Sequence, residues 1–129
     1  DYIPGRDGDG VPRVLACFMQ ALLDGKPMML VDGGEAYRTI TYIEDAVDAL
    51  SRMLEVPNKA KNTFFNLGNR ANEVTMRELA HEMRDVYAEI TGNPDYRTHP
   101  CEVLSSEKFY GPGYEDCDRR VPDVRRAER

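Results

Sequence analysis

The sequence predicts an α/β fold, because helical and strand-like segments alternate along most of its 129 residues. Apolar residues recur every three or four positions in three segments, which is the period of an amphipathic helix. Short apolar runs bounded by glycine, asparagine or aspartate lie between these segments and are typical of buried strands. Because the strands are few and short, we expect either a small α/β domain or the substrate-binding half of a larger enzyme.

The composition limits the classes of protein to which the chain can belong. With 41% hydrophobic and 31% charged residues, it is expected to fold rather than remain disordered. Its 23 acidic and 17 basic residues give a net charge of −6, which disfavours nucleic acid as a partner. No apolar run approaches the roughly 20 residues of a membrane-spanning helix. Three cysteines without a Cys-x-x-Cys pair argue against a metal site and favour a reducing, cytoplasmic location.

The N-terminal third is expected to form a loop, a helix and two strands. Residues 1–10 are rich in glycine, proline and aspartate, which predicts a loop. Because the sequence does not begin with methionine, we expect it to be a fragment of a longer chain. Apolar residues at helical spacing predict a helix that begins near Pro12 and ends at Gly25. The apolar run Met28–Val31 predicts a strand, and residues 38–42 predict a second.

The middle of the chain predicts two more helices around another strand. Residues 43–54 have acidic residues at their start and apolar residues on one face, which predicts a helix that ends at Pro57. Residues 63–67 predict a buried strand. A third helix is expected after Thr75, because Glu78 stands three residues later at the spacing of a capping box.

The last predicted strand lies around residues 97–104, and a tail rich in glycine, proline and charge follows. We therefore expect an α/β core over residues 11–104 and a tail over residues 105–129. His81 and His99 have no partner motif, so each is expected to be solvated or structural. The chain also lacks a G-x-G-x-x-G turn, a phosphate-binding G-x-x-x-x-G-K loop and a G-x-S-x-G elbow. It therefore contains no complete active site that its motifs can identify.

Arginines are the candidate ligand-binding residues. Arg13 lies at the expected start of a helix, where the helix dipole also attracts anions. Arg38 follows a Gly-Gly turn, and Arg119-Arg120 lie in the glycine-rich tail. Each guanidinium offers the planar set of donors that matches a phosphate or carboxylate. The alternative is that each arginine pairs with an acidic residue on a solvated surface.

The strand Met28–Val31 offers a possible surface for a flat ring. Met29 and Val31 are two residues apart, so they share one face of that strand. A base could lie against this face while Arg38 neutralises a diphosphate nearby. Alternatively, both residues belong to the hydrophobic core.

Several stretches in a fixed order carry a family resemblance. They are Asp1-Tyr2-Ile3-Pro4-Gly5, residues 10–18, Asp32-Gly33-Gly34, Tyr42-Ile43-Glu44-Asp45, Phe65-Asn66-Leu67-Gly68-Asn69 and residues 109–120. Together they cover nearly the whole chain, and it resembles the C-terminal part of extended short-chain dehydrogenase/reductases that act on nucleotide sugars. Within that family it is most similar to the UDP-glucuronate decarboxylase group. The resemblance implies a substrate-binding portion whose Rossmann half lies upstream.

The resemblance also implies a reaction. Tightly held NAD oxidises UDP-glucuronate at C4, carbon dioxide is lost, and reduction gives UDP-xylose or, after ring contraction, UDP-apiose. By this resemblance Arg120 is the catalytic residue beside the sugar carboxylate. The substrate-binding residues that it implies are Arg13, Met29, Val31, Arg38 and Tyr114. NAD is expected to bind mainly upstream, in a cytoplasmic homodimer, and this chain alone is expected to be inactive.

Other functions stay open at this point. One is the UDP-glucuronate decarboxylase of the aminoarabinose pathway, which has a similar tail, and another is a different NAD-dependent nucleotide-sugar epimerase or dehydratase. A stand-alone nucleotide-binding module would bind UDP without the upstream half. A structural or dimerisation fragment would not respond to ligand.

Overall fold

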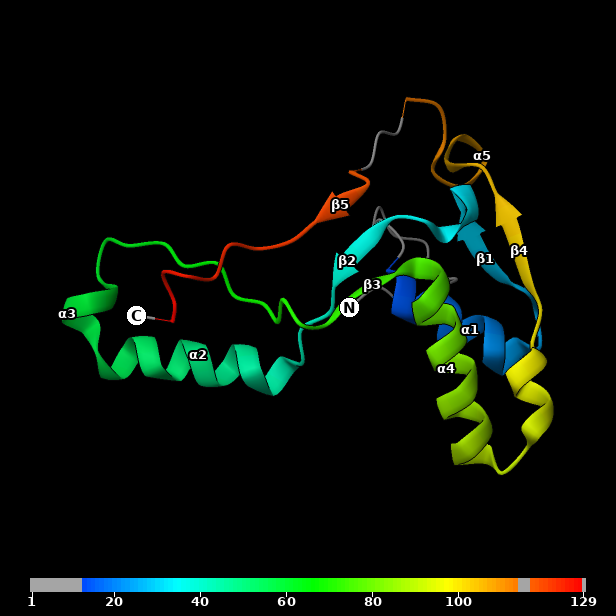
Figure 1. The fold of residues 1–129 in the computed structure, drawn as a ribbon, viewed down its shortest axis with the longest axis horizontal. Coiled ribbons are helices and arrows are strands. Elements are labelled where there is room, and N and C mark those ends of the chain that lie inside the picture. Colours follow the sequence, from blue (N-terminus) through cyan, green and yellow to red (C-terminus); the bar gives the residue numbers. More distant parts are fainter. Residues whose placement is uncertain (1–12, 114–116, 129) are drawn as a thin grey trace. The chain divides into compact units, whose positions relative to one another are not determined.

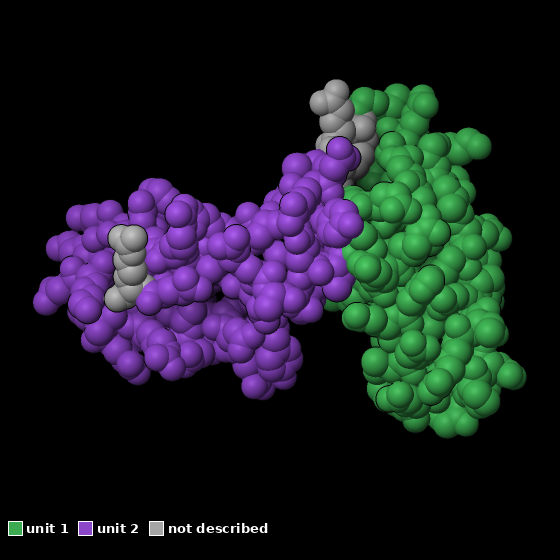
Figure 2. Space-filling view, viewed as in Figure 1, with its two compact units in different colours: residues 1–36, 75–116 green, residues 37–74, 117–129 purple. Residues whose placement is uncertain are grey.

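The computed structural model describes residues 13–113 and 117–128. These residues form two compact units, which are coloured separately in Figure 2. Among the described residues, the first unit contains 13–36 and 75–113, and the second contains 37–74 and 117–128. None of the helices over the described residues combines the length and apolarity needed to cross a membrane.

The first unit packs two long helices beside a pair of parallel strands (Figure 1). Its elements, in chain order, are α1 (Val14–Asp24), β1 (Met28–Val31), the 3-10 turn η1 (Asp32–Gly34), α4 (Met76–Thr91), η2 (Pro94–Thr98), β4 (Cys101–Leu104) and α5 (Ser106–Tyr110). Strands β1 and β4 are paired in register from Met28 with Cys101 to Val31 with Leu104. The core includes Phe18, Leu22, Met28, Leu30 and Leu79.

Local signals explain where the two long helices begin and end. Helix α1 ends at Gly25, which takes the left-handed conformation (φ 64°) that glycine adopts without steric cost. Thr75 and Glu78 form the predicted capping box at the start of α4: the Thr75 Oγ1 accepts from the Glu78 amide at 3.1 Å, and the Thr75 amide donates to the Glu78 carboxylate at 2.8 Å. The predicted helix ends are therefore confirmed at both places.

His99 has a structural environment. It is buried, and its Nε2 donates to the carbonyl oxygen of Lys26 at 2.7 Å. Its own carbonyl oxygen accepts from Arg84 Nη1 at 2.7 Å. His81 is exposed on α4. Both outcomes agree with the prediction of solvated or structural histidines.

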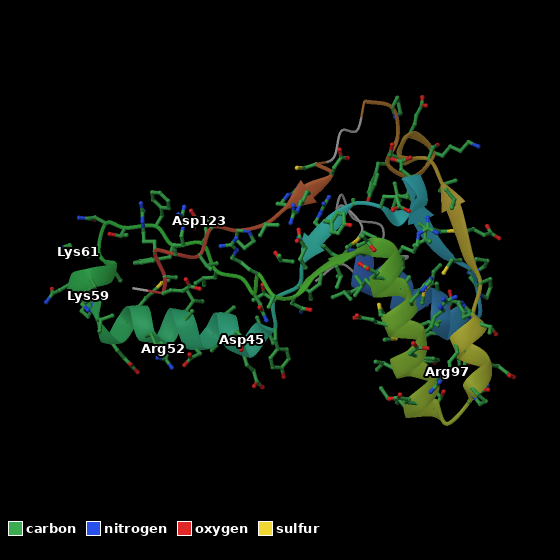
Figure 3. All side chains as sticks on the ribbon, viewed as in Figure 1. Asp45, Arg52, Lys59, Lys61, Arg97 and Asp123 are labelled. Atoms are coloured by element: carbon green, nitrogen blue, oxygen red, sulfur yellow. The ribbon has the colours of Figure 1, made fainter. Side chains whose placement is uncertain are left out.

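The second unit contains α2 (Ile43–Glu55), α3 (Pro57–Ala60) and a small sheet of three strands in the order β3-β2-β5. Strand β2 spans Tyr37–Thr39, β3 spans Glu73–Thr75 with its last residue in the first unit, and β5 spans Arg119–Arg120. Charged side chains such as Arg52 on α2 and Lys59 on α3 project from the ribbon (Figure 3).

The predicted strand over residues 63–67 is wrong, because this segment has no regular pairing in the structure. A strand needs a neighbour to accept its backbone hydrogen bonds. Here the segment is held by other groups: the Arg126 guanidinium donates to the Phe64 carbonyl oxygen at 3.2 Å and lies 4.3 Å from the Phe64 ring centre. The Asn66 amide donates to the Asp123 carbonyl oxygen at 3.1 Å. The segment is therefore extended beside the C-terminal residues without becoming part of a sheet.

Helix α2 was predicted correctly, but no residue along it is buried. Its apolar residues recur on one face and are widely exposed: Ile43 at 67%, Val47 at 53%, Leu50 at 55% and Leu54 at 83%. Exposed apolar stripes of this kind are unusual on a complete soluble domain. Pro57, the predicted stop, instead begins the short helix α3, where its missing amide hydrogen costs nothing.

Candidate functional site

Strand β1 presents the apolar face that the sequence predicted. Met28 and Leu30 are buried, whereas Met29 and Val31 alternate with them and are half-buried. Met29 and Val31 therefore share a partly accessible side of the strand, as their spacing predicted. Both side chains are therefore partly exposed on the same face of β1.

Side-chain hydrogen bonds fix the turn that follows β1. The Arg77 guanidinium donates to the Gly33 carbonyl oxygen at 2.6 Å and to the Glu35 carboxylate at 2.8 Å. Gly34 has φ 75°, and an added Cβ there would lie 3.0 Å from the Arg77 amide nitrogen. The Asp32 carboxylate accepts from the Ser106 amide at 3.0 Å, which ties the turn to the start of α5. Glycine is required at position 34 by both its conformation and the closeness of this backbone.

Arg13 lies at the N-terminus of α1, as predicted. It is the N-cap residue, with extended backbone angles (φ −94°, ψ 125°), and its side chain is exposed. Its carbonyl oxygen accepts from the Cys17 amide at 3.0 Å. The guanidinium is thus at the positive end of the helix dipole, which adds to its attraction for an anion.

Arg38 and Arg120 are brought together by the pairing of β2 with β5. The two strands are parallel, and the register places Arg38 opposite Arg120 and Tyr37 opposite Arg119. Arg38 is half-buried, and its Nη1 donates to the carbonyl oxygens of Tyr37 at 2.6 Å and Cys117 at 2.8 Å. Arg120 is exposed. Two neighbouring guanidinium groups offer a favourable position for an anion such as a phosphate or carboxylate.

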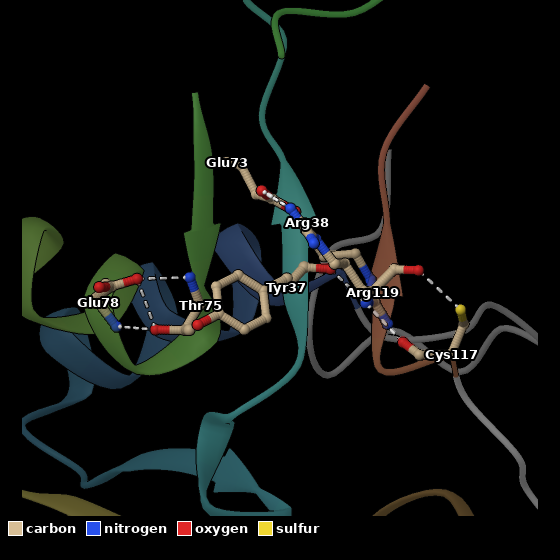
Figure 4. A network of polar contacts seen from close by, with 7 residues as sticks. All are labelled: Tyr37, Arg38, Glu73, Thr75, Glu78, Cys117 and Arg119. Carbon is tan, nitrogen blue, oxygen red and sulfur yellow. Dashed lines mark hydrogen bonds and ion pairs between the residues drawn. The ribbon is translucent and has the colours of Figure 1, made fainter. Parts of the chain in front are cut away.

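Arg119 occupies a different environment from its neighbour in sequence (Figure 4). Its Nε and Nη2 donate to the two carboxylate oxygens of Glu73 at 2.7 and 2.8 Å. The guanidinium also lies 5.9 Å from the centre of the Tyr37 ring. The hydrogen bonds from Arg119 lower the pKa of Glu73 and raise the pKa of Arg119. The ion pair therefore stays charged at neutral pH.

The structure groups the predicted site residues in two sets. Arg13, Met29 and Val31 belong to the first unit, and Arg38 and Arg120 form a pair in the second. Tyr114 lies outside the described residues.

Three residues that hold the turn after β1 and the small sheet were not predicted to do so: Glu73, Arg77 and Arg119. Each acts through a partner more than 40 residues away in the sequence. No local pattern signals such a partner.

A surface hollow elsewhere in the second unit contains none of the predicted residues. It has a volume of about 350 Å³ and is lined by Phe64, Asn66, Asp123, Arg125 and Arg126. The Arg125 guanidinium donates two hydrogen bonds to the Asp123 carboxylate and the Arg125 amide donates a third, and together they hold the pKa of that carboxyl well below its usual range. Across the described residues no group of three or more His, Cys, Asp or Glu side chains is placed to hold a metal ion.

Comparison with known proteins identifies the class. Residues 2–68 match the model of the NAD dependent epimerase/dehydratase family, and the chain belongs to that family. It is 51% identical over 126 residues to UDP-D-apiose/UDP-D-xylose synthase of Oryza sativa subsp. japonica, covering 96% of this chain and 31% of that protein. It is also 51% identical to UDP-D-apiose/UDP-D-xylose synthase 2 of Arabidopsis thaliana, of which it covers 32%.

A solved structure supports the same classification. The crystal structure of the PbgP3 protein from Burkholderia pseudomallei matches with a TM-score of 0.69 and 28% identity, over 92% of this chain and 32% of that one. The family predicted from the motifs is thus confirmed. The chain spans about a third of the length of the relatives that it matches.

Proposed function

We propose that this chain is the C-terminal, nucleotide-sugar-binding part of an NAD-dependent UDP-glucuronate decarboxylase that makes UDP-apiose and UDP-xylose. The observation that carries the proposal is the pairing of Arg38 with Arg120 on neighbouring strands. The relatives named above are synthases of UDP-apiose and UDP-xylose, and they are 51% identical to this chain over the 126 residues that align. A UDP-glucuronate molecule carries a diphosphate and a carboxylate, so it supplies anions for two separate arginines.

The roles of the arginines follow from where charge lies in the reaction. Arg38 contacts the diphosphate, which is charged throughout the reaction, and Arg13 contacts the sugar or the diphosphate, so each contributes mainly to substrate binding. When the 4-keto acid loses carbon dioxide, an electron pair moves onto the sugar ring and forms an enolate. Arg120 stabilises that developing charge. Because the pKa of an arginine exceeds 12, electrostatic stabilisation suits Arg120 better than proton donation.

The remaining predicted contacts are apolar or aromatic. Met29 and Val31 offer their half-buried face to the uracil ring, and Tyr114 contacts the UDP-sugar. NAD, expected to bind mainly outside these residues, would supply the hydride acceptor for oxidation at C4 and the hydride for the final reduction. The 129 residues contain no G-x-G-x-x-G turn, so we assign none of them to NAD.

The complete enzyme is proposed to be a cytoplasmic homodimer. Within this chain, residues 1–10 are proposed to be a loop, 11–104 an α/β core and 105–129 a substrate-contacting tail.

The decisive experiment uses the complete protein from which this chain comes. Incubated with UDP-glucuronate and NAD, it should release carbon dioxide and yield UDP-xylose and UDP-apiose, identified by mass spectrometry and NMR. An upstream sequence with a glycine-rich NAD motif and a Tyr-x-x-x-Lys pair is expected. Turnover of a nucleotide sugar without release of carbon dioxide would instead identify another epimerase or dehydratase. Tight UDP binding by these 129 residues alone would favour a stand-alone binding module.

A further inference from the structure

Strand β5 is only two residues long, so its pairing with β2 needs support from side chains. The backbone contributes one close contact before it, from the Tyr37 amide to the Asp118 carbonyl oxygen at 2.7 Å. Arg38 adds a hydrogen bond to the Cys117 carbonyl oxygen at 2.8 Å. An isolated pairing of this length is marginal in water.

The Glu73–Arg119 ion pair is an attachment of a different kind, because it joins the two outer strands of the sheet. Glu73 lies on β3 and Arg119 on β5, with β2 between them. Both carboxylate oxygens are used, and the Glu73 side chain is only 19% exposed. A two-point contact of this geometry restricts the direction of the guanidinium as well as its distance.

This attachment also sets the position of the next residue along the strand. Arg120 follows Arg119 on β5, and the register places it opposite Arg38 on β2. Successive side chains of a strand point to opposite faces, so Arg120 points away from the face on which Arg119 contacts Glu73. The ion pair on one face therefore fixes β5, and with it the register that sets Arg120 opposite Arg38.

We propose that Glu73 is a positioning residue for Arg120, which it keeps in register beside Arg38 by holding Arg119. The proposal rests on the proposed function of Arg120 as the residue that stabilises charge during decarboxylation. Glu73 itself touches no substrate. Because Arg119 lowers the pKa of Glu73, the carboxylate remains charged in mildly acidic as well as neutral solution.

The test measures strand pairing and activity separately, in the complete protein. Glu73→Gln keeps the size of the side chain and removes its charge. Exchange of the Tyr37 amide hydrogen, which reports pairing of β2 with β5, should become about threefold to tenfold faster, as expected for loss of a two-point ion pair on a partly exposed surface. The kcat for release of carbon dioxide should fall by a similar factor, whereas the Kd for UDP should change less than twofold.

Three further variants make the result specific. Arg119→Lys keeps the charge but loses the two-point contact, so it should accelerate Tyr37 exchange and lower kcat to a smaller extent. This variant replaces Glu73→Gln in the test if Glu73→Gln does not fold. Exchanging the charges, with Glu73→Arg and Arg119→Glu together, should recover part of the lost rate. Asp48→Asn removes an exposed ion pair with Arg52 on α2 and should leave both measurements unchanged.

The outcomes distinguish this proposal from the proposed function. If Tyr37 exchange is unchanged in Glu73→Gln and in Arg119→Lys, Glu73 does not position β5 and the proposal is overturned. Loss of activity with unchanged exchange has the same consequence. If wild-type protein releases no carbon dioxide but Glu73→Gln still accelerates Tyr37 exchange, the structural role stands and the proposed reaction fails.

Discussion

At the scale of single residues, Arg119 and Arg120 show how adjacent arginines differ in their surroundings. Arg119 forms an ion pair with Glu73, whereas Arg120 lies opposite Arg38. We expect Arg120→Met in the complete enzyme to lower kcat for decarboxylation by about 10²-fold or more, because a lost donor to developing charge costs that much in other enzymes. UDP binding, measured by calorimetry, should be nearly unchanged. Arg120→Lys should recover only part of the rate, since it keeps the charge but not the planar fork.

The ion pair with Glu73 changes the choice of control for that experiment. Arg119 is the natural neighbour control by sequence, but its removal would disturb β5, so Arg52→Met on the exposed side of α2 is the better match. That control should retain wild-type kcat. Equal and mild losses in the Arg119→Met and Arg120→Met variants would show that the two form a solvated basic patch.

Arg38 is expected to affect binding more than chemistry. Its side chain is fixed by two backbone carbonyl oxygens, so it can meet a diphosphate with little further loss of entropy. Removal of a charge-assisted contact costs about 1.5–3 kcal/mol, so Arg38→Ala should raise the KM for UDP-glucuronate roughly tenfold to hundredfold, with a smaller change in kcat. Steady-state kinetics and UDP titration both measure this. UDP affinity equal to that of wild type would leave Arg38 with a structural role only.

At the scale of elements, the capping box of α4 gives a prediction about pH. Hydrogen bonds from Thr75 lower the pKa of Glu78 in the folded protein. The ionised Glu78 carboxylate therefore contributes fully to stability above the usual pKa of a glutamate, and this contribution is lost as the pH falls through the lowered pKa of the folded state. Thr75→Ala should destabilise the helix start by about 1 kcal/mol at neutral pH. Hydrogen exchange in the first turn of α4, followed from pH 7 to pH 3, should show the effect. Glu78→Gln should remove its pH dependence.

The helices could be predicted from the sequence because their signals are local. Gly25 ends α1, and the Thr75–Glu78 spacing begins α4, each within four residues of the helix that it defines. The pairing of strands in the small sheet could not be predicted, although residues 38–42 were predicted as a strand and overlap β2 (Tyr37–Thr39). Strand β5 has two residues and no pattern of its own, and its partner β2 lies about 80 residues earlier. Likewise, the strand predicted over residues 63–67 contains the strand-favouring Phe64, but a strand also requires a neighbour, which the described residues do not provide.

At the scale of the whole molecule, the apolar stripe of α2 distinguishes this chain from the complete protein. Because the chain spans about a third of its relatives, we expect further residues to cover Leu50 and its neighbours. In the complete protein Leu50→Glu should then cost about 1.5–3 kcal/mol, the value of burying one leucine side chain, as measured by urea unfolding. Ser51→Glu, one position further round the helix, should cost far less. Equal effects of the two substitutions would mean that this face stays in water.

The pairing of β2 with β5 also has a consequence for biosynthesis. Arg38 and Cys117, which share a hydrogen bond, are 79 residues apart in the chain. At about 5–20 residues per second, a ribosome needs roughly 4–16 s to pass from one to the other. The helix α1 and the strand β1 precede Arg38, and α2 and α4 are synthesised during that interval, while Arg38 still has no β5 beside it. A chain released early, before residue 117, would therefore keep most of its helices and lose the arginine pair, so normal helix content would conceal the loss of the candidate site.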